Sequence, residues 1–199
     1  YEPGRYFVEG QLAYAYNEAD TSRSINFGGL NRIASGEYDA NQFSATVNAG
    51  LPLKGGAFTF IPKAGLFYSY ADADSYTETG AGSMNLVVKP ATASVLEGSL
   101  GASASFERKM GSGVLRPEVR VAALYEFLDD DAATSSRFTG ATTTFTTTGL
   151  KPAQFGSTAG LGLSYASSNG AWDVRLDYDA VLREDFISHG GMVMGRLFF

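Results

Sequence analysis

Charged side chains of both signs recur at alternate positions in two stretches of this chain. The first stretch contains Arg116, Glu118, Arg120 and Glu126, and the second contains Asp173, Arg175, Asp177, Asp179 and Arg183. Residues two apart in an extended strand point to the same face, so each set forms one charged stripe. Opposite charges on neighbouring strands pair, which predicts cross-strand ionic ladders. Such a surface either hydrates a pore or neutralises itself and stiffens the sheet, and the sequence leaves both interpretations open.

Further charged residues occupy the polar face of other alternating stretches. These residues are Arg5, Glu9, Lys63, Glu97 and Arg196. We expect them to line the same surface as the two stripes.

Groups that could support catalysis are sparse. His189 is the single histidine, and its position beside Gly190 and Gly191 predicts a short loop before the final strand. The chain has no cysteine and no Gly-x-Ser-x-Gly nucleophile turn. The aspartates at 129–131 lack the glycine-spaced pattern of a calcium loop, so we interpret them as a solvated loop tip. We therefore predict a protein that is not an enzyme and that needs no metal or cofactor.

Alternation between large apolar and polar residues places the charges on β-strands. Residues 172–183 are the clearest case, with Trp172, Leu176 and Tyr178 on the face opposite the charges. A helix would mix the two sets. The same pattern covers residues 6–17, 42–51, 58–70, 96–106, 115–127, 155–165 and the last stretch of the chain, about eight strands in all.

Strand and loop lengths separate the two antiparallel folds that alternate in this way. Strands of a soluble sandwich have about five or six residues, whereas a tilted membrane strand needs about nine to eleven. The stretches found here reach the longer length. Short connections at 53–56, 109–113 and 167–170 alternate with long polar ones at 18–39, 71–91 and 129–149. This asymmetry predicts an all-β fold, an antiparallel transmembrane β-barrel of the bacterial outer membrane.

The composition fits one such domain over residues 1–199. A net charge of -6 argues against nucleic acid as a partner, because phosphates require a basic surface. No stretch approaches the roughly 18 apolar residues of a membrane helix. We expect outer-membrane lipid and lipopolysaccharide as the surroundings. Because no signal peptide opens the chain, we expect a mature form or a fragment.

Several short motifs, in order, carry a resemblance to a known family. They are Tyr14, Tyr16, Asn17 and Asp20 with Arg23, Ile25 and Phe27, then residues 34–38, 59–62, 76–81, 115–118 and 160–162, and Trp172. Their order and spacing resemble the autotransporter β-domain, the translocator of type V secretion. The resemblance covers essentially the whole chain and corresponds to the C-terminal two-thirds of the family's barrel.

The resemblance implies a barrel that anchors and exports its own N-terminal passenger domain. Family barrels have about twelve strands, with a helix or linker in the lumen, so strands and a passenger would precede the residues seen here. The charged stripes would then hold the linker. The alternative is a self-contained barrel of about eight strands with a structural or adhesive role through its long loops; such a barrel leaves no aqueous channel.

The resemblance also implies that the barrel-assembly machinery recognises the end of the last strand. The terminal aromatic residue is Phe199, and Leu197 and Val193 share its phase. Met194 stands where the family pattern has glycine, and Gly195 follows one position late.

Overall fold

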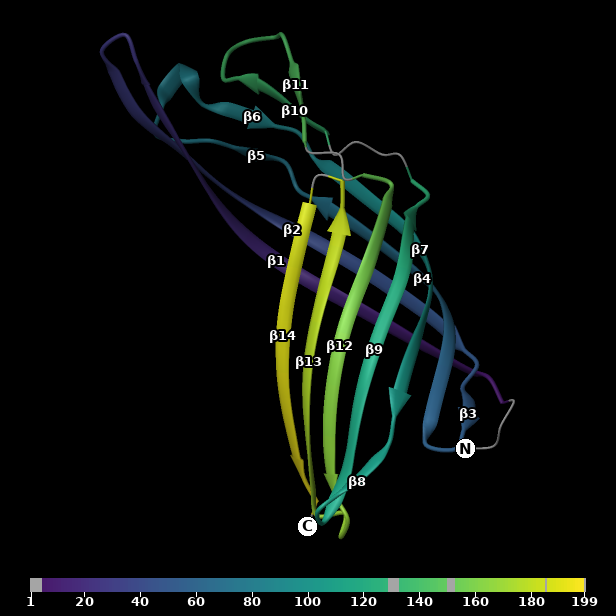
Figure 1. Ribbon diagram of the computed structural model, residues 1–199. Helices are drawn as coiled ribbons and strands as arrows, with labels where there is room; N and C mark the ends of the chain where they lie inside the picture. The colour runs from purple at the N-terminus through teal and green to yellow at the C-terminus, as the bar shows by residue number, and fades with distance from the viewer. Residues whose placement is uncertain (1–4, 129–132, 150–152, 185, 199) are drawn as a thin grey trace.

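The structure is a computed structural model that describes residues 5–128, 133–149, 153–184 and 186–198. Long antiparallel strands follow one another in chain order through one sheet (Figure 1). They are β1 Phe7–Phe27, β2 Leu30–Gly50, β4 Phe58–Ala73, β7 Ala91–Phe106, β9 Gly113–Glu126, β12 Phe155–Ser167, β13 Trp172–Arg183 and β14 Phe186–Leu197. Two short strands, β3 Leu53–Gly55 and β8 Arg108–Met110, pair with β4 and β9. The predicted all-β antiparallel architecture is confirmed.

The first hairpin turns on two glycines. Phe27 pairs with Leu30, and the intervening Gly28 and Gly29 have φ angles of 55° and 83°. A type I′ hairpin turn, whose twist matches that of its strands, needs positive φ at both positions, which glycine adopts without a steric penalty. The chain therefore reverses here without a loop.

This hairpin corrects one prediction. Residues 18–39, expected to be a long loop, form the outer halves of β1 and β2, and we call them the arm. The arm extends well beyond the other long strands (Figure 1). Large apolar residues stop alternating beyond Tyr16, so the hydrophobic pattern fades while the backbone ladder continues to Phe27. Other residues cover only one face of the arm, so most residues of the arm are polar.

The other two long connections also contain short elements. Residues 71–91 include β5 Tyr76–Thr77, the single-turn helix η1 Gly82–Met84 and β6 Leu86–Val88, and residues 129–149 include β10 Ala133–Phe138 and β11 Phe145–Thr148. These strands form a second sheet in the order β11-β10-β6-β5. The predicted loop tip, Asp129, Asp130 and Asp131, lies outside the described residues.

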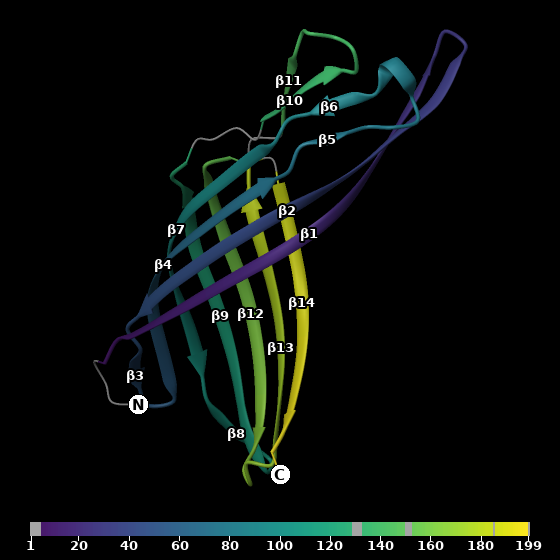
Figure 2. The same ribbon diagram turned by 180° about the vertical axis from the view of Figure 1, so that it is seen from behind.

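The large sheet curls but is open at both margins. Among the described residues, β1 pairs with β2 alone and β14 with β13 alone. Figures 1 and 2 show the curled wall from opposite sides, with β1 and β14 as its margins. The structure also places His189 within β14, opposite Ala180, and not in a loop. The neighbouring glycines that suggested a loop are strand residues on the margin of the sheet.

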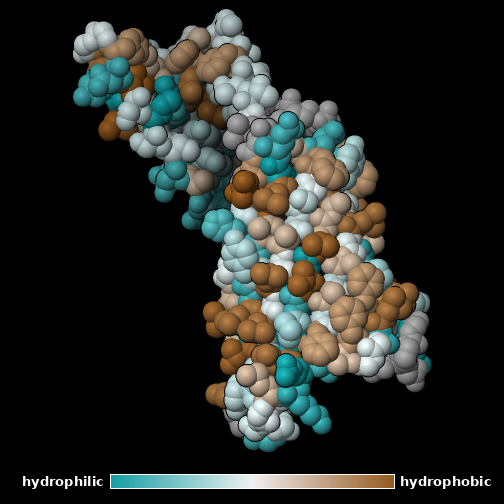
Figure 3. Space-filling view, in the orientation of Figure 1, coloured by the Kyte–Doolittle hydropathy of each residue, from teal (hydrophilic) through white to brown (hydrophobic). Residues whose placement is uncertain are grey.

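The two faces of the wall differ in chemistry. The convex face carries an apolar band whose side chains align across strands, as Leu163, Leu176 and Val193 do. Leu176 is 44% exposed and Val193 is 75% exposed. The brown patches on the body of Figure 3 show apolar residues gathered on its surface. An exposed apolar band backed by a polar face suits a wall between lipid and water.

Most buried apolar side chains lie outside this band. Ile25, Ala34 and Ala81 form a small core with Met84 packed against it, between the arm and the segment that contains η1. No helix in the described part of the chain is long and apolar enough to cross a membrane.

Candidate functional site

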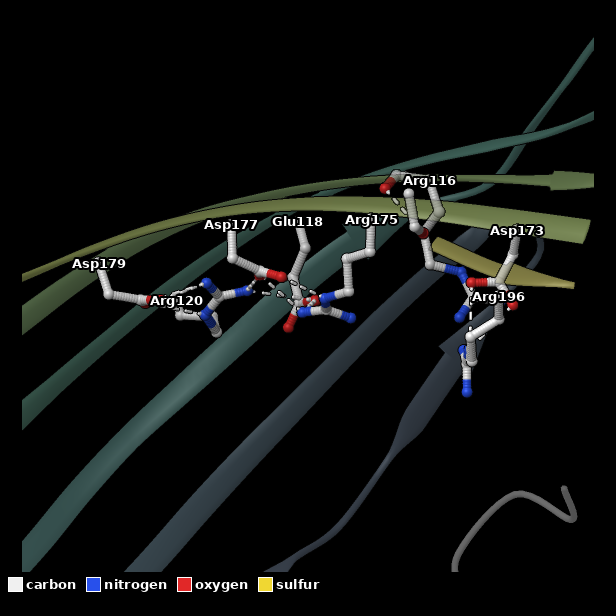
Figure 4. A network of polar contacts seen from close by, with 9 residues as sticks. Arg116, Glu118, Arg120, Asp173, Arg175, Asp177, Asp179 and Arg196 are labelled. Atoms are coloured by element: carbon white, nitrogen blue, oxygen red, sulfur yellow. Dashed lines mark hydrogen bonds and ion pairs between the residues drawn. The ribbon is translucent and has the colours of Figure 1, made fainter. Parts of the chain in front are cut away.

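The charged stripes meet on the concave face in one network (Figure 4). Arg120 from β9 places Nη1 2.8 Å from Oδ1 of Asp177 and Nη2 2.9 Å from Oδ1 of Asp179. Arg175 donates from Nε to Oδ2 of Asp177 over 2.6 Å and from Nη2 to Oε2 of Glu118 over 3.2 Å. The Asp177 side chain is 6% exposed, so the network shields its central carboxylate. These ion pairs join β9 to β13, which are not neighbouring strands, and join Arg175 to Asp177 within β13.

Two glycines let Arg120 reach its partners. Strand β12 lies between β9 and β13 in the sheet, so the guanidinium must cross it. The residues of β12 below that path are Gly160, paired with Arg120 and Asp179, and Gly162, paired with Glu118 and Asp177. A Cβ on Gly162 would lie 2.8 Å from Nη1 of Arg120, and a Cβ on Gly160 would overlap the Asp179 carboxylate. The missing side chains form a passage for the arginine.

Other predicted residues form separate ion pairs along the same face. Arg196 of β14 lies 3.0 Å from Asp173 of β13. Arg183 pairs with Glu97 of β7, and its Nη1 donates to the Ala153 carbonyl over 2.7 Å. Arg116 pairs with Glu107, a residue that the sequence analysis did not include because it lies between strands β7 and β8. These pairs bind strands to one another at both ends of the wall.

Four further residues were predicted on this face: Lys63, Glu9, Glu126 and Arg5. Lys63 lies with Asn48, Arg120 and Asp179 around a hollow of about 200 Å³. Glu9 accepts a hydrogen bond from Asn48 over 3.3 Å. Glu126, the last residue of β9, accepts backbone hydrogen bonds from Leu96 of β7 and from Leu128. Arg5 lies exposed just before β1.

The network carries an excess of negative charge beside a hollow. Two arginines, Arg120 and Arg175, face Glu118, Asp177 and Asp179, and the Asp179 side chain is 58% exposed. A hollow of about 710 Å³ opens over β13 and β14 at this point. Asp179 is paired with Gly190, which has no side chain to cover it. One carboxylate therefore remains accessible from the concave side.

The concave side of β14 differs from the polar surface that alternation predicted. Met192 pairs with Asp177 and Met194 with Arg175, so both methionines share the charged face, at 49% and 39% exposure. The convex side of the strand carries Val193 and Leu197, two of the three residues expected to form an assembly signal. The third, Phe199, lies outside the described residues.

A second charged site, missed by the sequence analysis, joins the arm to the second sheet. Arg23 of β1 donates from Nε to Glu78 over 3.1 Å and from Nη2 over 2.5 Å, and also to the Met84 carbonyl over 2.9 Å. Glu78 is 5% exposed. Burial alone would raise the pKa of Glu78, but hydrogen bonds from Arg23 and the Leu86 amide outweigh it and hold that pKa below its ordinary value. The sequence signal for this site was weak: Arg23 and Glu78 are isolated charged residues in two segments that were predicted to be loops.

We expect the contact between Arg23 and Glu78 to be sensitive to acid. Because the pKa of Glu78 is lower in the folded protein, its stabilisation is complete above the ordinary value of 4.5 and is lost as pH falls through the lower folded value. The Ser35 and Thr79 amides, which donate to each other's carbonyls over 2.9 and 2.8 Å, are the reporters. We expect their hydrogen-exchange protection, corrected for intrinsic rates, to fall below pH about 4. In Glu78→Gln the protection is lower throughout and independent of pH; a wild-type profile flat to pH 3 would contradict the assignment.

No group of three or more His, Asp or Glu side chains within the described ranges is arranged to hold a metal ion. His189 lies on the convex face, where its ring centroid is 6.2 Å from that of Tyr178. The arrangement on the concave face can neutralise, orient and hydrate a polar chain.

An antiparallel strand wall with an apolar convex face and a charge-lined concave face defines the class of outer-membrane β-barrel proteins. The family model "Autotransporter beta-domain" matches residues 1–179, and the chain belongs to this family of type V secretion translocators. It is therefore a bacterial outer-membrane protein.

A curated relative is similar over almost the whole chain. Outer membrane protein A of Rickettsia conorii (strain ATCC VR-613 / Malish 7) is 27% identical over 203 residues, which cover 97% of this chain. The matched region is 10% of that protein, so this chain spans about a tenth of the relative's length.

Proposed function

We propose that this domain anchors a passenger polypeptide in the outer membrane and exports it through a lumen lined by the concave face. The observation that carries the proposal is the division of one wall into an apolar convex band and a concave face on which Arg120 and Arg175 are already paired with carboxylates. A passing chain must be hydrated without being held. Paired charges suit this task because Arg120 and Arg175 have their carboxylate partners before the chain arrives.

The open margins support a larger barrel. Backbone amides and carbonyls of a membrane strand must be hydrogen-bonded, because hydrocarbon offers no partner. Strands β1 and β14 each have one unpaired side among the described residues. We propose that further strands pair with both margins and bring the barrel to about twelve strands. Closure with eight strands would require β1 to pair with β14 and would fill the lumen with side chains.

The hollow over β13 and β14 suits a linker that remains in the lumen after export. Met192 and Met194 offer apolar contact, and Asp179 offers an exposed carboxylate beside them. An amphipathic segment with one basic side chain would satisfy both. We propose this hollow as the place where the passenger linker contacts the wall.

Further partners follow from the same proposal. Val193 and Leu197 on the convex side of β14, with Phe199, would be recognised by the barrel-assembly machinery, and lipopolysaccharide would surround the outer leaflet. Export through a lumen requires no covalent chemistry by the wall, so we propose that the domain itself is not an enzyme.

Photo-crosslinking in the membrane tests the export route. Thr158 of β12 lies on the concave face beside Lys63 and Arg120, whereas Val121 of β9 is 54% exposed on the convex face. A photoreactive residue at position 158 of the whole protein should crosslink to the passenger during export. The same residue at position 121 should crosslink to lipid. Passenger crosslinks from position 121 and none from 158 would contradict a route along the concave face.

A further inference from the structure

The second sheet is fixed to the arm at one side. Tyr76 of β5 stacks on Tyr38 of β2, with ring centroids 5.1 Å apart, and Ala81 is completely buried against the arm. The Arg23 and Glu78 pair closes the same contact. Ala81 and Glu78 are buried in this contact, so the β5 side of the sheet is held in place before any partner binds.

The opposite side of this sheet is a free strand edge. β11 pairs with β10, and no second partner exists for it among the described residues. All four residues of β11 are exposed. In both views β10 and β11 rise above the ends of the long strands β9, β12 and β13 (Figures 1 and 2). The edge therefore faces solvent on the side where β1 and β2 form the arm.

This edge lacks the charges that guard other short edges of the chain. Residues 139–149 contain no charged residue and no proline. The short strands β3 and β8, which also have a single partner each, carry Lys54, and Arg108 with Lys109. Proteins place lysine, proline or bulges on free edges to prevent the addition of another strand. Among the described residues of this edge, the protection that remains is the short length of β11.

Two aromatic rings stand beside the edge. Phe138 of β10 and Phe145 of β11 have ring centroids 5.7 Å apart and are 41% and 40% exposed. Strand addition gains affinity from backbone hydrogen bonds and specificity from contacts with alternate side chains. The pair offers such a contact to an apolar side chain of an added strand.

We propose that the β11 edge accepts an extended, uncharged segment of the exported polypeptide as a fifth strand of this sheet. The inference rests on the proposed export function, which brings the polypeptide out on this side of the membrane. A tethered chain reaches millimolar effective concentration at a nearby site, which offsets the small size of a four-residue edge. An uncharged edge favours an uncharged segment, because it has no group to neutralise a buried charge.

Crosslinking of the whole protein in the outer membrane of a Gram-negative host tests the proposal. A photoreactive residue at Thr147, on the edge, should capture the exported polypeptide at least about fivefold more than one at Thr142, in the connecting turn. Capture of a second copy or of lipopolysaccharide alone from position 147, while the passenger still reaches the surface, would overturn this inference and leave the export function intact. An assembled barrel that exports nothing would overturn both.

A charge on the edge gives an independent readout. Thr147→Lys should slow the appearance of protease-resistant passenger at the cell surface about threefold, and Thr142→Lys should not change it. Equal rates for the two variants would overturn the inference, because the barrel assembly that both share would then account for the behaviour.

Discussion

Leu176→Arg is expected to destabilise the membrane-inserted domain by about 2–4 kcal/mol. Leu176 lies on the convex face of β13, between Leu163 and Val193 on the neighbouring strands. The guanidinium of an arginine there must either lie in hydrocarbon or extend to the membrane–water interface, and both arrangements disturb the packing of the wall. The free energy of unfolding in lipid vesicles, from denaturant titration, measures the effect.

A matched variant on the same strand separates the two faces. Val181 shares the concave face with Asp179, and both line the hollow over β13 and β14. Val181→Arg should therefore change the free energy of unfolding by less than about 1 kcal/mol, since the charge meets water and a carboxylate. Equal losses for the two variants would mean that the faces are wrongly assigned.

Gly160→Ala is expected to cost about 1–3 kcal/mol because the added methyl group fills the passage used by Arg120. Its Cβ would lie 2.9 Å from Nε of Arg120 and would overlap the Asp179 carboxylate. The Asp179 carboxylate must then move, and the guanidinium of Arg120, which also contacts the nearly buried Asp177, must shift with it. The unfolding midpoint in lipid and the thermal stability of the folded barrel both report this loss.

Gly190→Ala is the control, because it makes the same change on the same face. A Cβ at Gly190 would have no atom within 4 Å. We expect no loss of stability, since alanine favours a strand more than glycine does. If Gly160→Ala behaved in the same way, the glycine passage would not be needed for the network.

The alternation of apolar and polar residues in the sequence was sufficient to predict much of this fold. The convex positions of β13 and the charged positions of its concave face were all identifiable from alternation, because one face meets lipid and the other meets water. The ionic network between β9 and β13 also followed from residue type. Its route across β12 did not, because small residues at Gly160 and Gly162 gave no pattern of their own.

The parts outside the membrane were less predictable. Arg23, Ile25 and Glu78 belong to segments with little apolar alternation, and their contacts join residues far apart in the chain. Local patterns contain no information about such contacts. The position of Met192 and Met194 on the concave face was not predicted for a different reason. They are apolar residues on a face expected to be polar, at the margin of the sheet.

The most direct test of the export proposal is a structure of the whole protein in a lipid bilayer that shows the partners of β1 and β14. We predict that both strands pair with further strands and that a passenger segment lies in the lumen against β13 and β14. Direct pairing of β1 with β14, closing a barrel of about eight strands filled by its own side chains, would contradict export through this wall.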